Sequence, residues 1–92
     1  MRTLMKRRTE LYRTDWNGIL LEITYEPAWM PAHIMGEDAA HIEVRSIYPT
    51  AAPLPIAKAG FYSNALPASI VSAAGGPVAY VDVMLTVEGG AP

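Results

Sequence analysis

The stretch ILLEITYE, residues 19–26, alternates between apolar and polar side chains and predicts a half-buried β-strand. The side chains predicted to face the core are Ile19, Leu21, Ile23 and Tyr25. Those predicted to face outward are Leu20, Glu22, Thr24 and Glu26. We expect Pro27 to end this strand, because a proline nitrogen donates no hydrogen bond to a neighbouring strand.

A second alternating stretch, AHIEVRSIY at residues 40–48, predicts the neighbouring strand. The side chains predicted to face the core here are Ile42, Val44, Ser46 and Tyr48. We expect the two strands to be antiparallel, because the intervening residues 27–39 show no obvious crossover helix and predict a connection. This pairing would place Glu22 or Glu26 opposite Arg45.

The segments around these strands carry weaker signals. Residues 1–14 predict either a short helix or a frayed terminus. DWNG, residues 15–18, predicts a turn, because Asn-Gly adopts positive φ at low cost. Residues 49–67 contain four prolines and predict a loop with short edge strands at 54–57 and 60–63.

The C-terminal third contains two candidate helices. In residues 66–76, Pro67 suits a first helical turn and Gly75 suits a helix end. Residues 77–87 are ambiguous. The Gly-Pro pair before them favours a helix start, whereas their β-branched side chains and alternation favour a strand.

Length and composition limit the class of protein. A chain of 92 residues with 51% apolar residues predicts one folded domain. We expect a basic segment at residues 1–14, a single domain at 15–88 and a flexible tail at 89–92. The chain has no cysteine, which excludes a disulfide scaffold, a zinc–thiolate site and a cysteine nucleophile. With no membrane-spanning run and no signal peptide, it predicts a cytoplasmic protein of a bacterial host cell.

Charge is distributed unevenly along the chain. Residues 1–13 contain five basic residues and one acidic residue, whereas residues 14–92 contain two basic and eight acidic residues. Such a distribution bears on partners rather than on fold. We expect the basic segment to complement an acidic surface, either that of its own chain or that of a dimer mate.

Two sets of charged residues are candidate binding residues. The acidic set predicted to contact a basic partner is Glu22, Glu26, Glu37, Asp38 and Glu43. The basic set, which would contact nucleic acid in an alternative reading, is Arg2, Lys6, Arg7, Arg8 and Arg13. We consider nucleic acid the less favoured partner, because the body of the chain is acidic.

The large apolar residues, the histidines and the serines are further candidates. Trp29 and Met30 lie between two prolines and could form an exposed apolar anchor for a partner. We favour core packing for them, as for the other large apolar residues such as Phe61. His33 and His41 flank two acids, but their spacing matches no usual metal motif, so we predict no metal site and no cofactor. No serine lies in a G-x-S-x-G elbow, and we predict no enzymatic activity.

Four pieces carry a family resemblance through their order and spacing. They are ITYEPAW, AHIEVRSIYP, APLPIAKAGFYS and AAGGPVAYVDVML. Together they resemble a set of small uncharacterised alphaproteobacterial proteins, many of them encoded near phage or plasmid genes. The resemblance implies a helix at residues 77–86. The predicted fold is therefore α+β, a small antiparallel sheet of three to four strands with one or two C-terminal helices on one face.

A small, acidic, cysteine-free product of a mobile element also resembles the anti-CRISPR proteins in type. Several of those place an acidic surface where a CRISPR effector would hold DNA. The resemblance implies a non-enzymatic inhibitor, in its sharpest form a type I anti-CRISPR protein whose acidic face binds the basic DNA-binding surface of a Cascade subunit. The expected partners are thus a basic protein surface such as a CRISPR effector complex, and a second copy in a homodimer, with no membrane partner.

Overall fold

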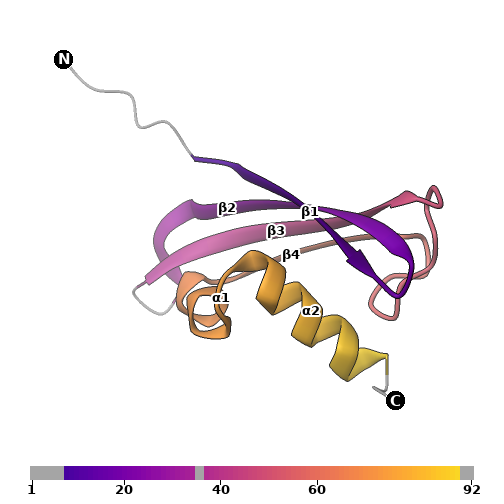
Figure 1. The fold of residues 1–92 in the computed structure, drawn as a ribbon. Coiled ribbons are helices and arrows are strands. Elements are labelled where there is room, and N and C mark those ends of the chain that lie inside the picture. The colour runs from indigo at the N-terminus through magenta and orange to yellow at the C-terminus, as the bar shows by residue number, and fades with distance from the viewer. Residues whose placement is uncertain (1–7, 35–36, 90–92) are drawn as a thin grey trace.

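Four antiparallel strands, arranged in chain order, form one sheet, and two helices cover a single face of it (Figure 1). The computed structural model describes residues 8–34 and 37–89, with only the backbone described at 31–34 and 37. The elements are β1 (Glu10–Trp16), β2 (Ile19–Ile34), β3 (Glu37–Tyr48), β4 (Phe61–Pro67), α1 (Ala68–Ala74) and α2 (Pro77–Glu88). The predicted α+β class is confirmed.

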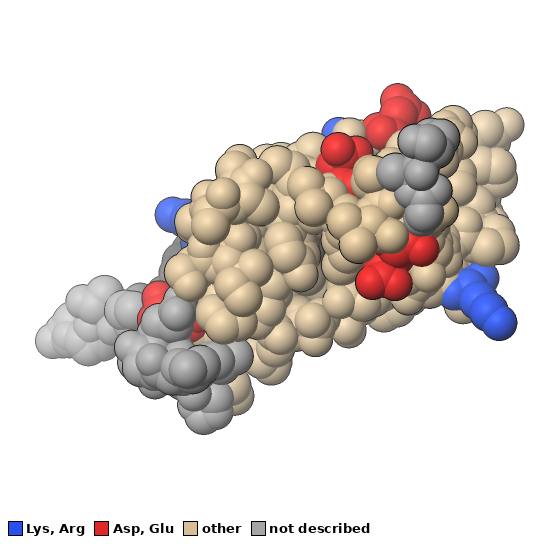
Figure 2. Space-filling view, turned by 90° about the horizontal axis from the view of Figure 1, so that it is seen from below, with Lys and Arg blue, Asp and Glu red and all other residues tan. Residues whose placement is uncertain are grey.

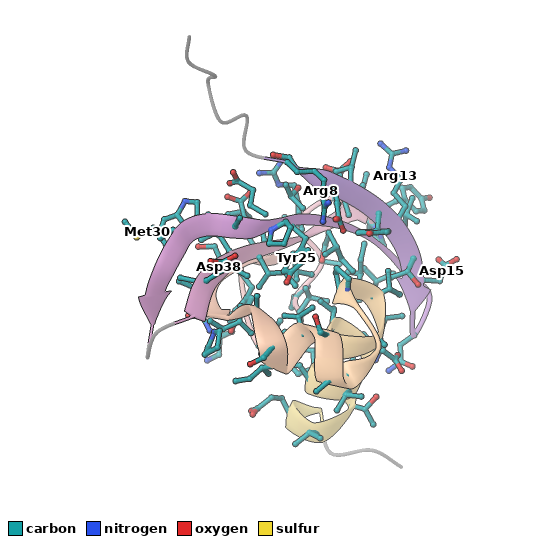
Figure 3. All side chains as sticks on the ribbon, turned by 90° about the vertical axis from the view of Figure 1, so that its left-hand side faces the viewer. Arg8, Arg13, Asp15, Tyr25, Met30 and Asp38 are labelled. Atoms are coloured by element: carbon teal, nitrogen blue, oxygen red, sulfur yellow. The ribbon has the colours of Figure 1, made fainter. Side chains whose placement is uncertain are left out.

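The sheet curves around the helices, so that it has a concave face toward them and a convex face away from them (Figures 1 and 3). Helix α1 packs against β3 and β4, and α2 packs against β1 and β2. The largest fully buried side chains, which come from both layers, are Leu21, Ile23, Ile42, Val44, Val71, Val81 and Leu85. The core therefore lies between the concave face and the helix pair, as the alternation in residues 19–26 and 40–48 predicts.

The first hairpin corrects the prediction of a helix within residues 1–14. Residues 10–16 form strand β1, which pairs with β2 so that Trp16 lies opposite Ile19. The predicted turn is confirmed, since Asn17 and Gly18 have φ of 49° and 81°. Residues 10–14 of this segment are strand because β2 forms hydrogen bonds with them. The predicted domain division at residue 14 falls inside β1, and residues 1–7 lie outside the described part of the chain.

Strand β2 is longer than predicted, because Pro27 does not end it. The strand continues to Ile34, through most of the segment predicted as a connection. The register shifts between Glu26, which pairs with His41, and Met30, which pairs with Ala39. This irregularity gives β2 extra residues around Pro27. Proline has no N–H to donate, and here it lies where the regular hydrogen-bond ladder is already interrupted. The antiparallel pairing of β2 with β3 is confirmed, with Glu22 opposite Arg45.

A second register shift reverses the direction predicted for Tyr48. Leu21 pairs with Ser46, but Leu20 pairs with Tyr48, so Ile47 is an extra residue on β3. Tyr48 consequently leaves the core face and is 71% exposed. The prediction that Tyr48 faces the core is wrong for this reason, whereas that for Ser46 is confirmed.

The connection from β3 to β4 is held against the sheet by Ser46. The backbone N–H of Ser46 donates to the Gly60 carbonyl (2.8 Å), and its hydroxyl donates to the Ala52 carbonyl (2.7 Å). Leu54 in this connection is buried in the core and forms a single bridge with Ala57, where a short strand was predicted. The predicted edge strand is confirmed but runs from Phe61 to Pro67.

Both C-terminal helices are present. Pro67 precedes α1 as its N-cap, and Gly75 follows it with φ of 106°. In α2, Pro77 occupies the first turn as predicted, and Val81 and Leu85 are buried one helical turn apart. Within the described residues, no single helix is long and apolar enough to cross a membrane; α1 and α2 meet that criterion only when counted together, and they are bent by 84°.

Burial of Tyr25 predicts a loss of stability at alkaline pH. Tyr25 is 5% exposed, and burial raises the pKa of its hydroxyl, with a further increase from Glu10 and an opposing decrease from Arg8. The raised pKa means that the unfolded chain releases this proton first as pH increases. We expect the free energy of unfolding to hold below about pH 10 and to fall above it.

Urea unfolding at a series of pH values from neutral to alkaline checks this expectation. Tyr25→Phe should show a shallower fall above about pH 10 than the unaltered protein, because phenylalanine has no proton to lose. An equally steep fall in both proteins would assign the pH dependence to other groups.

Candidate functional site

The convex face of the sheet is the candidate functional site. Helices cover the concave face only, and Figure 3 shows Arg13 and Met30 directed away from the helices and Tyr25 toward them. The polar, charged and large apolar side chains that the strand register places on the convex face are Leu11, Arg13, Asp15, Leu20, Glu22, Thr24, Glu26, His41, Glu43, Arg45, Tyr48, Phe61 and Ser63. Trp29 and Met30 extend it along β2.

One row across all four strands alternates in charge. Arg13, Glu22, Arg45 and Phe61 lie on β1, β2, β3 and β4 in successive register positions. The Arg13 Nη2 donates to the Glu22 Oε2 at 3.2 Å. The Arg45 guanidinium carbon lies 5.3 Å from the centre of the Phe61 ring, within the range of a cation–π interaction. The row therefore presents fixed charges of both signs with an aromatic side chain at one end.

The next two rows of convex-face residues, which cross β2 at Thr24 and Glu26, contain no arginine or lysine on β2 and β3. Thr24 lies opposite Glu43, and Glu26 lies opposite His41. The Trp29 ring lies over His41, with the ring centres 4.8 Å apart and the planes tilted by 38°. His41 is thus half-buried beneath an aromatic side chain, and the acidic groups of this part of the face are carried by the central strands β2 and β3.

The acidic set predicted from the sequence is only partly brought together. Glu22, Glu26 and Glu43 share the convex face, and two arginines interleave with them. Asp38 lies two residues before the buried Ala40 and shares its face, so it belongs to the concave side of β3. The side chain of Glu37 lies outside the described residues. Sequence reasoning missed the arginine beside Glu22 because it placed no strand before the Asn-Gly turn.

The described members of the basic set contact acids of the same chain. Arg8 forms an ion pair with Glu10 at 3.0 Å, in addition to the pair between Arg13 and Glu22. Exposed pairs of this kind contribute only about 0.2–1 kcal/mol. The Tyr12 hydroxyl also donates to Glu10 (2.5 Å), and this bond raises the Tyr12 pKa. The remaining basic candidates lie outside the described residues and are Arg2, Lys6 and Arg7.

Exposed apolar side chains lie around the charged centre of the convex face. Leu11 is 60% exposed, Tyr48 71%, Phe61 44% and Met30 40%. The prediction of core packing is therefore wrong for Met30 and Phe61, because the register turns them away from the helices. Trp29 is half-buried against His41. The alternation within Phe61–Pro67 could have indicated which residues share a face with Phe61. Which of the two faces is buried depends on the register with the neighbouring strand.

The helix side of the molecule differs in charge. Figure 2 shows that side largely free of basic side chains, with a few acidic ones. The two helices carry Asp82 and Glu88 as their charged residues. Their exposed large apolar side chains are Ile70, Val83 and Val87.

Among the residues that the structure describes, no group of three or more His, Asp or Glu side chains is arranged to hold a metal ion. The side chains of His33 and Glu37 lie outside those residues, so the predicted absence of a metal stays a prediction. Ser46 is buried, and its hydroxyl serves the connection between β3 and β4.

Comparison with known proteins gives one family. Residues 9–92 match the family model described as the KlcB third domain, and the match spans all four strands and both helices. KlcB is a plasmid-encoded protein. No curated protein and no solved structure gives a significant match.

Proposed function

The chain belongs to the KlcB third domain family, and we propose that it is a non-enzymatic protein-binding module of a plasmid-associated accessory protein. Plasmid association agrees with the mobile-element resemblance of the four sequence pieces. The contact surface that we assign to this module is the convex face of its sheet.

The observation that carries the proposal is the exposure of large apolar side chains on a sheet face that no described element covers. Leu11, Tyr48 and Phe61 are each more than two-fifths exposed there. Aromatic and aliphatic side chains supply most of the binding energy at protein interfaces, and charged groups around them supply specificity. The ordered charges of the Arg13–Glu22–Arg45 row would orient such a partner.

The chemistry of this face favours a partner with apolar contacts and an excess of basic groups. Three glutamates and two arginines occupy the convex positions of the central rows, and Arg13 is already paired with Glu22. Electrostatic attraction between the glutamates and a basic partner would therefore supplement the apolar contacts and would not replace them. The sharpest version of the proposal retains the predicted partner, a type I CRISPR effector whose basic DNA-binding surface would be occupied.

Capture of a partner by variants of the two faces tests the proposal. The tagged protein is incubated with lysate of a plasmid-bearing host. Double replacement Leu11→Ala with Phe61→Ala should reduce capture of the specific partner about tenfold or more, because it removes two exposed apolar contacts. Val87→Ala removes an apolar side chain that is even more exposed, but on the helix side; it is the control and should leave capture unchanged.

The outcomes separate the versions of the proposal. Equal loss of capture in both variants would overturn the assignment of the convex face. A purified type I CRISPR effector should bind the unaltered protein and should not bind the double variant Glu26→Lys with Glu43→Lys. Absence of binding to the unaltered protein would reject the anti-CRISPR version. Recovery of nucleic acid that disappears on nuclease treatment would move the function to the basic segment.

A further inference from the structure

The two edges of the sheet differ in charge. Strand β1 carries Glu10, Arg13 and Asp15 within its seven residues. Strand β4, FYSNALP, carries no charged residue, and its only proline, Pro67, is its last residue. Charged residues and prolines protect the edges of natural sheets from pairing with further strands. By this criterion β1 is a protected edge and β4 is not.

The outer side of β4 is also without a backbone partner in the described part of the chain. Its ladder runs to β3 only, from Phe61 opposite Arg45 to Pro67 opposite Ala39. The backbone hydrogen bonds that join separate segments of the described residues involve Gly60 but none of residues 61–67. Unpaired N–H and C=O groups along a regular strand form a template for one more strand.

We propose that β4 pairs with β4 of a second copy of this chain, in an antiparallel dimer with a continuous eight-stranded sheet. A twofold axis places each strand against its own copy, so a charged residue at or next to the axis would lie opposite or diagonal to the same charge. An uncharged strand meets this requirement, and the charged β1 does not.

A register centred on Asn64 would use the whole strand. Tyr62 of each copy would then lie opposite Leu66 of the other on the concave side, and Phe61 opposite Pro67 on the convex side. Tyr62 is half-buried and Leu66 is buried in the single chain, so both already pack toward the core that the new pair would extend.

The helix layer supplies a second contact on the same side. Helix α1 packs against β3 and β4, and its Ile70 is 49% exposed. Two α1 helices brought beside each other by strand pairing would bury such aliphatic surface in a second layer. The dimer would thus continue both layers of the domain, and it would place two convex faces side by side on one sheet.

Sedimentation analysis across a concentration series tests this dimer. The unaltered chain of 10.0 kDa should reach twice that mass at micromolar concentrations. Ser63→Lys and Ser63→Glu place a charge at an exposed β4 position and should each raise the dimer Kd about tenfold or more. An equimolar mixture of the two variants should regain the dimer, because residue 63 of each copy would be a diagonal neighbour of residue 63 of the other, and opposite charges at diagonal positions attract.

The matched control introduces a lysine at an exposed position of the other edge strand, Asp15→Lys on β1, and should leave the dimer Kd unchanged. Circular dichroism confirms that each variant is folded. A monomer at all concentrations, or a dimer that is insensitive to Ser63→Lys, would overturn the proposal. The result is independent of partner capture by the convex face, so failure of one proposal is distinguishable from failure of the other.

Discussion

Replacing Gly60 with alanine is expected to lower the free energy of unfolding by about 3 kcal/mol or more. Gly60 has φ of 77°, where an alanine is strained by roughly 1–2 kcal/mol. A Cβ at this position would also lie 2.7 Å from the carbonyl carbon of Ala51 and 2.8 Å from its Cα. Those are backbone atoms, so the connection between β3 and β4 must move to accommodate the methyl group.

That movement would affect the buried hydrogen bonds of Ser46. The Gly60 carbonyl accepts the Ser46 N–H, the Ala52 carbonyl accepts its hydroxyl, and the Ala51 N–H donates to its carbonyl at 3.3 Å. Ser46 is 3% exposed, so water cannot easily replace a lost partner, and each unsatisfied group costs about 1–3 kcal/mol. The same connection positions Tyr48 and Phe61 at its two ends.

Gly18→Ala is the matched control for the contact with Ala51. Gly18 has φ of 81°, close to that of Gly60, but a Cβ there would meet no atom within 4 Å. Gly18→Ala should therefore lower the free energy of unfolding only by the conformational cost, about 1–2 kcal/mol. Urea unfolding of both variants measures the difference, and equal losses would show that the close approach to Ala51 does not hold in solution.

Leu85→Ala is expected to destabilise the domain by about 2–5 kcal/mol, because it empties a fully buried position. Leu85 is 0% exposed on α2 and packs in the core with Val81. The free energy of unfolding of a domain of this length is only about 5–14 kcal/mol, so this substitution would remove a substantial share of it. Thermal or urea unfolding measures the change.

Comparison with Val83→Ala and Val87→Ala makes this a test of helical geometry. In a strand, alternation would place Val81, Val83, Leu85 and Val87 on the same face. In the observed helix, Val83 and Val87 are 55% and 69% exposed while Leu85 is buried. The valine variants should therefore change the free energy of unfolding by no more than about 0.5 kcal/mol. Large losses at both valines would contradict the helical register of α2.

Local sequence determined those features that depend on neighbouring residues alone. Period-two alternation identified the core faces of β2 and β3, and the Asn-Gly turn was assigned from its tolerance of positive φ. Pro67 and Gly75 marked the limits of α1 because proline fits a first turn and glycine fits the left-handed end. The acidic groups of the convex face followed from the same alternation.

Tertiary structure decided the features that depend on partners distant along the chain. Residues 10–16 are a strand because β2 lies beside them, and Tyr48 is exposed because one extra residue on β3 shifts the register. Residues 77–88 carry β-branched side chains that favour a strand, yet burial of Val81 and Leu85 against the sheet stabilises a helix. The position of Arg13 has the same origin, since the pairing of β1 with β2 brings it opposite Glu22. Local preferences amount to tenths of a kcal/mol per residue, and burial of a single large side chain outweighs several of them.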